Sequence, residues 1–157
     1  MRRILSFVSV LTVGVLGPWM LPPLAEADTV WTPGVLVSAP DLLADPDDWI
    51  GPVHSFPEDG YPCGSASVES TSLVKMAGDY VYVKDTCKDG RSAVARITGQ
   101  EDGHWHTRIC RNAYGKGTWA RCNYDWLEDP EKYLASGVYN GDTGYLHFGT
   151  SWMFENG

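Results

Sequence analysis

Four cysteines, Cys63, Cys87, Cys110 and Cys122, are the residues of this chain whose possible chemistry depends most directly on spacing. No two of them lie within four residues of each other. The chain therefore lacks the C-x₂₋₄-C spacing of zinc sites and the C-x-x-C spacing of redox-active pairs. An even number of cysteines without those spacings is typical of a disulfide framework. Of the possible pairings we expect Cys63–Cys87 and Cys110–Cys122, because each closes a short local loop.

The stretch from Cys110 to Cys122, CRNAYGKGTWARC, has an Asn- and Gly-rich centre between two runs with strand character. If the two runs pair with Cys110 opposite Cys122, side-chain alternation places Arg108 opposite Tyr124 on the same face. The stretch therefore predicts a disulfide-stapled hairpin rather than a metal site or a reactive thiol pair.

Two further sets of side chains could ligate a metal ion: the histidines His104, His106 and His147, and the carboxylates Asp79, Asp85 and Asp89. Polar histidines on a strand surface are the simpler interpretation of the first set. Calcium near the second set is an open alternative, but turn chemistry and solvated charge explain the same residues. We expect no metal site and no cofactor.

Catalysis has little support in the residue pattern. Asp125, Glu128 and Asp129 are candidates for acid–base work on sugars, but an acidic chain offers such pairs by chance. The serines lack a G-x-S-x-G context, and bridged cysteines supply no thiolate. We therefore expect no catalytic residue and a non-enzymatic protein, with a small extracellular hydrolase as the least favoured alternative.

Aromatic residues are abundant, with 7 tryptophans and 8 tyrosines, and many fall on the later predicted strands beside short polar residues. Exposed rings flanked by polar groups suit glycan or protein recognition, because a ring buries a large area at low entropic cost. Core packing is the competing interpretation of each ring. We expect exposure at Tyr114, with Trp119 or Trp126 beside it. The candidate ligand-binding residues are Tyr114, Lys116, Trp119, Tyr124 and Trp126.

Short alternating runs separated by glycine turns predict the elements that position these residues. The expected strands are 65–76, 79–87, 92–98, 104–112, 118–126 and 145–154. Asp89-Gly90 predicts a tight hairpin turn. The pattern over 128–141 is ambiguous and allows a short helix capped by Asp129. This spacing of strands and turns predicts an all-β fold, an antiparallel β-sandwich or small barrel.

Residues 1–27 have the features of a secretory signal peptide. Arg2 and Arg3 precede an apolar run, and Ala25-Glu26-Ala27 matches the small-x-small pattern that would place cleavage before Asp28. Prolines interrupt the run before it reaches the about 20 residues that a membrane span needs, so an uncleaved anchor is the less favoured alternative. We expect a secreted, extracellular protein that does not bind membranes after cleavage.

The segment 28–62 is rich in proline and aspartate, which predicts an extended arm with one helical turn around 41–44. Its apolar residues indicate that part of the arm lies on the disulfide-linked β-domain expected at 63–157. The formal net charge of the chain is −8, and an acidic protein repels phosphate backbones. We therefore expect no nucleic-acid partner, and a monomer.

Two motifs, GDYVYVKDTCKDGRSAVARI (78–97) and CRNAYGKGTWARCN (110–123), resemble a pattern in small secreted actinobacterial proteins of uncharacterised function. The resemblance covers under half of the chain after residue 27. It implies export and a small disulfide-linked β-domain, and it carries no catalytic residue.

The sequence as a whole predicts a secreted, non-enzymatic binding module for an extracellular glycan or protein. The alternative is an inhibitor of a foreign enzyme, in which the disulfide-held loop from Arg111 to Arg121 is the rigid presented element.

Overall fold

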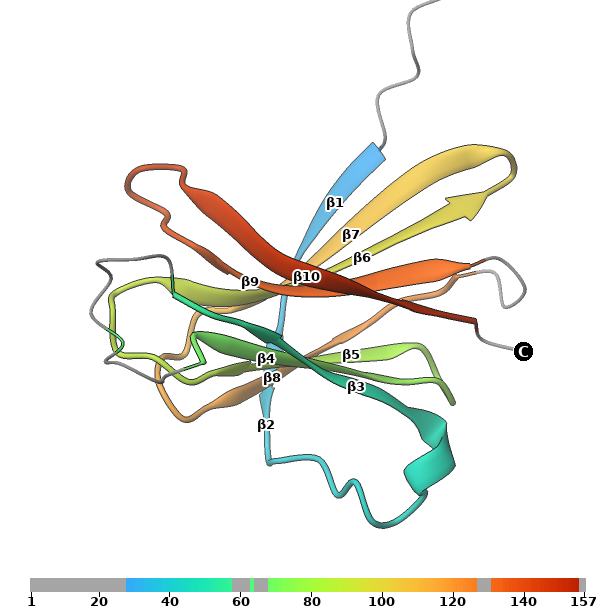
Figure 1. Cartoon of the computed structure of the whole chain (residues 1–157), viewed down its shortest axis with the longest axis horizontal. Coiled ribbons are helices and arrows are strands. Elements are labelled where there is room, and N and C mark those ends of the chain that lie inside the picture. Colours follow the sequence, from blue (N-terminus) through green and yellow to red (C-terminus); the bar gives the residue numbers. More distant parts are fainter. Residues whose placement is uncertain (1–27, 58–62, 64–67, 127–130, 156–157) are drawn as a thin grey trace, which may run out of the picture.

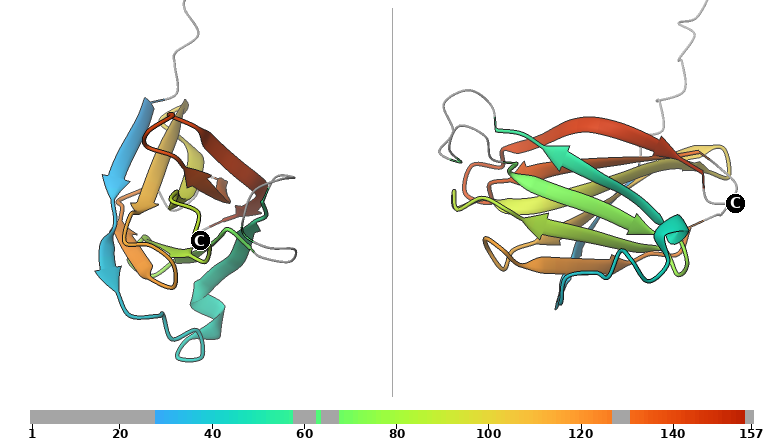
Figure 2. Two further views of the ribbon diagram at one scale, coloured as in Figure 1. Left: turned by 90° about the vertical axis from the view of Figure 1, so that its left-hand side faces the viewer. Right: turned by 60° about the horizontal axis from the view of Figure 1, so that its bottom comes forward.

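Ten strands in two sheets make up the part of the chain that the computed structural model describes, residues 28–57, 63, 68–126 and 131–155. Sheet A has the strand order β1-β7-β6-β9-β10, and sheet B has the order β2-β8-β5-β4-β3 (Figure 1). The sheets pack face to face without closing into a barrel (Figure 2), which confirms the predicted all-β sandwich. The strands are β1 Asp28–Pro33, β2 Val35–Val37, β3 Trp49–Ser55, β4 Ser70–Lys75, β5 Tyr80–Asp85, β6 Ser92–Glu101, β7 His104–Asn112, β8 Trp119–Asn123, β9 Lys132–Tyr139 and β10 Leu146–Phe154.

Strand β5 shows how the alternating pattern builds the sandwich. Val81 and Val83 are fully buried between the sheets, whereas Tyr80 and Lys84 lie on the outer face of sheet B. Burial of such apolar side chains on facing strands is what holds the two layers together. The core cluster consists of Val53, Val74, Val81, Val83, Ala93, Ala95, Ile97, Cys110, Ala120, Cys122, Trp126, Leu134 and Phe154.

The proline-rich segment that was expected to be an arm supplies edge strands of both sheets. β1 pairs with β7 in parallel, β2 pairs with β8, and β3 forms the opposite edge of sheet B. Proline is compatible with an edge strand, because the outer side of an edge needs no N–H donor. Pro33 ends β1, and Pro52 lies within the register shift of β3 between Ile50 and Val53.

The structure confirms both predicted disulfides, Cys63–Cys87 and Cys110–Cys122. The predicted hairpin around Cys110 and Cys122 is wrong, because β7 pairs with β6 in sheet A and β8 pairs with β5 in sheet B. Their disulfide, with a Cα–Cα distance of 5.8 Å, therefore joins the two sheets through the core. Arg108, predicted to face Tyr124 on a hairpin, donates instead to the carbonyl oxygen of Asp125 at 3.2 Å.

A second chain reversal also crosses between the sheets. The Asp89-Gly90 turn, predicted to close a hairpin, connects β5 of sheet B to β6 of sheet A. The β6–β7 hairpin turns at Asp102 and Gly103, whose φ values of 50° and 79° suit the left-handed residues of a tight turn. An Asp-Gly pair therefore identified a reversal in both places, but it did not identify the sheet that receives the next strand.

The helical expectations differ from the structure. Residues 132–139 form β9, so the short helix considered for 128–141 is wrong over this part, and Asp129 lies outside the described residues. The helical turn expected at 41–44 occurs instead as a 3₁₀-helix at Pro46–Asp48. Within the described ranges, no helix is long and apolar enough to cross a membrane. The expected signal peptide also lies outside the described residues.

Gly34 lies where the N-terminal strand passes from sheet A to sheet B, and the packing there leaves no room for a side chain. A Cβ atom at this position would lie 2.8 Å from the Cβ of Ala120 and 3.0 Å from the carbonyl oxygen of Arg111. The same carbonyl accepts a hydrogen bond from the N–H of Gly34 at 2.8 Å, so the strand cannot easily move away.

We predict that Gly34→Ala lowers the free energy of unfolding by about 1–3 kcal/mol, because the added methyl overpacks the crossing point. Gly141→Ala is the matched control, since its Cβ would meet its nearest neighbours at ordinary distances of 3.7 and 3.8 Å. Urea denaturation of both variants measures the difference. Equal stability of the two variants would contradict this account of the crossing point.

Candidate binding site

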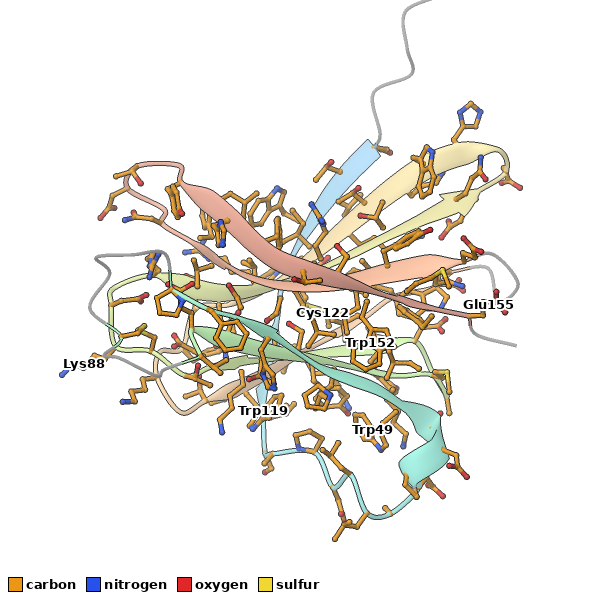
Figure 3. All side chains as sticks on the ribbon, in the orientation of Figure 1. Trp49, Lys88, Trp119, Cys122, Trp152 and Glu155 are labelled. Atoms are coloured by element: carbon orange, nitrogen blue, oxygen red, sulfur yellow. A yellow bond between two sulfur atoms is a disulfide. The ribbon has the colours of Figure 1, made fainter. Side chains whose placement is uncertain are left out.

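The connection between β7 and β8, residues 113–118, is the best-organised exposed segment at one end of the sandwich. We call it the recognition loop. Tyr114 is 53% exposed and Lys116 is exposed, so the structure places both predicted binding residues on the surface. Lys88, on the neighbouring β5–β6 connection, projects from the same end of the molecule (Figure 3).

A single buried amide, that of Asn112, organises the recognition loop. Its Nδ2 donates to the carbonyl oxygens of Val83 at 3.1 Å and Thr118 at 2.9 Å. Its Oδ1 accepts a bond from the N–H of Tyr114 at 3.0 Å and lies 3.2 Å from the hydroxyl oxygen of Thr118, whose single hydrogen is shared with the carbonyl oxygen of Gly115 at 2.6 Å. Sequence reasoning placed Asn112 in a turn-rich stretch and missed this role. The available signal was that Asn112 follows Cys110 by two residues on a strand, which points both side chains into the interior.

A second set of bonds fixes the loop against the end of β5. The N–H of Gly117 donates to the carbonyl oxygen of Asp85 at 2.7 Å, and the N–H of Asp85 donates to the carbonyl oxygen of Thr118 at 3.2 Å. Gly115 and Gly117 have φ values of 91° and 87°, a conformation that favours glycine. The main chain of the loop is therefore hydrogen-bonded to both sheets on either side of its tip.

An open cleft of about 490 Å³ separates the recognition loop from the β5–β6 connection. Burial raises the pKa of Asp85, which lines this cleft, to about 6. The hydrogen bond from the N–H of Cys87 and the charge of Lys116 lower this pKa, and the charge of Asp89 raises it. The lining residues are Asp85, Cys87, Lys88, Asp89, Gly90, Arg91, Gly115 and Lys116.

A buried ion cluster lies behind the cleft. The guanidinium of Arg91 pairs with the carboxylate of Glu69 and, at 2.6 Å, with that of Asp89. Burial lowers the pKa of Arg91, but the bonds to Asp89 and Glu69 outweigh that effect and raise it. Buried charges persist only when they are paired in this way. The cluster therefore anchors the β5–β6 connection, and its two carboxylates are engaged with Arg91.

The aromatic residues that were predicted to form one binding surface do not lie together. Trp119 is half-buried on the outer face of sheet B, with Nζ of Lys84 5.6 Å from the ring centroid (Figure 3). Tyr124 and Trp126 stack with centroids 6.1 Å apart beyond the opposite end of β8. Trp126 is only 4% exposed, so the expectation that it lies exposed beside the loop is wrong. Its ring completes the core instead.

The histidine set considered as metal ligands is separated, and of the aspartate set only Asp85 and Asp89 come together, on one cleft. His104 and His106 lie on β7 and His147 lies on β10, with β6 and β9 between them in sheet A. Asp79 precedes β5 and Asp85 ends it, so the two carboxylates lie at opposite ends of one strand. Among the described residues, Cys63, Cys87 and Asp89 bring three potential ligand atoms within 4.8 Å, but the two sulfurs are bonded to each other.

Comparisons with family models, curated proteins and solved structures find no match to this chain.

We predict that Asn112→Ala destabilises the fold by about 2–4 kcal/mol, because it removes the buried donor to the carbonyl oxygens of Val83 and Thr118 and the acceptor for the N–H of Tyr114. Amide hydrogen exchange at Tyr114 and Gly117 should accelerate more than exchange in β6. Asn123→Ala, at an exposed position of β8, is the matched control and should change stability by less than about 0.5 kcal/mol. Unchanged protection of the loop amides would show that Asn112 does not organise the loop.

Asp85 should make stability depend on pH. Its pKa in the folded state, about 6, lies above the ordinary value of 3.8. The protonated carboxyl therefore contributes its full stabilisation below pH 3.8, and this contribution is lost as the pH rises through 6. Asp85→Asn retains an oxygen that can accept the Cys87 N–H and removes the charge. The variant should gain stability relative to the parent as pH rises from about 4 to about 7, by up to about 3 kcal/mol. Urea denaturation across this range tests it, and a pH-independent difference would refute it.

Proposed function

We propose that this chain is a secreted, non-enzymatic binding domain that recognises a partner protein through the recognition loop. The observation that carries the proposal is the set of hydrogen bonds around Asn112, which fixes main-chain groups of the loop that carries the exposed Tyr114 and Lys116. A loop ordered before binding loses less conformational entropy in the complex. Tyrosine is also a frequent anchor at protein interfaces.

A protein partner fits the tip better than a glycan. Glycan binding through the predicted rings requires a shared flat surface, but Trp126 is buried and the ring of Trp119 lies under Lys84. Tyr114 and Lys116 instead offer one ring and one charge on a protruding loop. This combination is suited to a pocket on a protein surface.

The shape of the loop argues against an inhibitor that mimics an extended substrate. The N–H and the hydroxyl of Thr118 both donate to the carbonyl oxygen of Gly115, at 3.2 and 2.6 Å, so the loop folds back on itself. An extended peptide that adds to a partner's sheet needs its main-chain groups free. Binding through side chains at the tip is therefore the favoured mode.

Export is supported by the two disulfides and by the signal-like features of residues 1–27. A hydrolase receives less support. The carboxylates of Glu69 and Asp89 are both engaged with Arg91, and Asp85 accepts the N–H of Cys87 at 3.1 Å. These carboxylates therefore serve to hold the β5–β6 connection beside the recognition loop.

The test is a selection of random phage-displayed peptides on the oxidised protein, followed by affinity measurement on variants. We expect Tyr114→Ala and Lys116→Ala each to weaken the selected peptides at least tenfold, about 1.4 kcal/mol, because they remove the contact groups. Tyr114→Ala should change the free energy of unfolding by less than about 1 kcal/mol, as its side chain is exposed. Peptides that bind all variants equally would contradict the proposal.

A further inference from the structure

A second open hollow, of about 600 Å³, lies beside the recognition loop on the outer face of sheet B. It forms where the chain leaves β2 and passes the ends of β5 and β8. The recognition loop contributes Gly117 and Thr118 to its wall, so a molecule bound at the tip can reach it. The hollow is lined by Leu36, Val37, Ser38, Ala39, Lys84, Gly117, Thr118 and Trp119.

The lining is apolar with one charge. Val37 pairs with Trp119 across the β2–β8 ladder, so both side chains lie on the outer face, and Nζ of Lys84 lies 5.6 Å from the centroid of the Trp119 ring. The ammonium of Lys84 is the one charged group in the lining, and no described carboxylate lies within 4.0 Å of it. Lys75, which stacks on Trp49 on the same face, contrasts with it, because its ammonium pairs with Asp48 at 3.7 Å.

A neighbouring side chain extends the positive charge. Arg121, the next outward-facing residue of β8, stacks on Tyr80 at 4.5 Å, and it too has no described carboxylate within 4.0 Å. A ligand that carries carboxylates would complement this face.

We propose that the hollow binds an acidic segment of the partner protein, with an apolar side chain against Val37 and Trp119 and an adjacent carboxylate at Lys84. This inference rests on the proposed function, because it describes the partner that the recognition loop contacts. The carboxylate supplies the opposite charge that Lys84 lacks as a partner, and the apolar side chain covers Val37 and Trp119. Nucleic acid fits less well, since the lining offers apolar surface and a single cation to a polyanion.

The probe is an acetylated and amidated hexapeptide of alternating glutamate and leucine, compared with the same peptide carrying lysine in place of glutamate. Titration is followed by amide chemical shifts of the oxidised, isotope-labelled protein. We expect saturable shifts at residues 36–39 and 117–119 with the glutamate peptide and at least tenfold weaker binding of the lysine peptide. Added salt should weaken the glutamate peptide.

Lys84→Glu should weaken the glutamate peptide at least tenfold, and Lys84→Met, which keeps the stack on Trp119 without the charge, should also weaken it. Lys75→Met is the matched control and should stay within twofold of the parent. Both Lys84 variants are checked for folding by urea denaturation, and Lys84→Met serves as the test if Lys84→Glu is unstable. Equal binding of the two peptides, shifts confined to other strands, or insensitivity to both Lys84 variants would overturn the inference.

Two further measurements separate this inference from the proposed function. Tyr114→Ala should leave hexapeptide binding unchanged while it weakens the phage-selected peptides, so each proposal can fail alone. Sedimentation tests whether a second copy fills the hollow, since Leu43 is 89% exposed and lies near several aspartates in sequence. Self-association that Lys84→Glu abolishes would replace the partner protein with a second copy of this chain.

Discussion

The disulfide between Cys110 and Cys122 fixes the distance between the two sheets at the point where the chain must cross from one to the other. Strands β7 and β8 are consecutive, yet they lie in different layers, and their bridged cysteines are 5.8 Å apart at the Cα atoms. Asn112 follows on the same inward face and bonds to main-chain groups of β5 and of the loop. The disulfide and the Asn112 side-chain amide together hold the short connection between β7 and β8 in place.

The polar side chains near this connection are explained by the passage of the chain from one sheet to the other. Short connections that cross between layers leave main-chain groups at the rim of the core, where water is scarce. Asp85 and Asn112 satisfy several of these groups, and Arg91 pairs with the neighbouring carboxylates of Glu69 and Asp89. Burial, together with the nearby charge of Asp89, explains the raised pKa of the Asp85 carboxyl group. The charged side chains at this end of the domain thus serve its connections.

The cysteine pairing and six of the ten described strands could be predicted from the sequence, because both depend on local spacing. Strands β1, β2 and β3 were expected to be an arm, and the segment of β9 allowed a short helix, so pairing with other strands decided these elements. The alternation of Val81 and Val83 with Tyr80 and Lys84 identified β5, and short loops identified both disulfides. Sheet membership could not be predicted, since Asp89-Gly90 favours a reversal whichever layer receives the next strand. The exposure of Tyr114 could be predicted because this residue lies in a loop rich in asparagine and glycine. The burial of Trp126 could not, because it depends on packing between distant segments. The clustering of Lys84 with Trp119 required the register between β5 and β8.

The passage of the N-terminal strand across both layers at Gly34 has a consequence for the order of folding. β1 and β2 form the first described part of the chain, but they pair with β7 and β8, which emerge much later in synthesis. Pairing over such sequence separation is entropically slow, so these strands dock after the central strands have formed. Until then β7 and β8 each present an unpaired edge. The time before docking is therefore the period in which the chain is most prone to edge-to-edge aggregation.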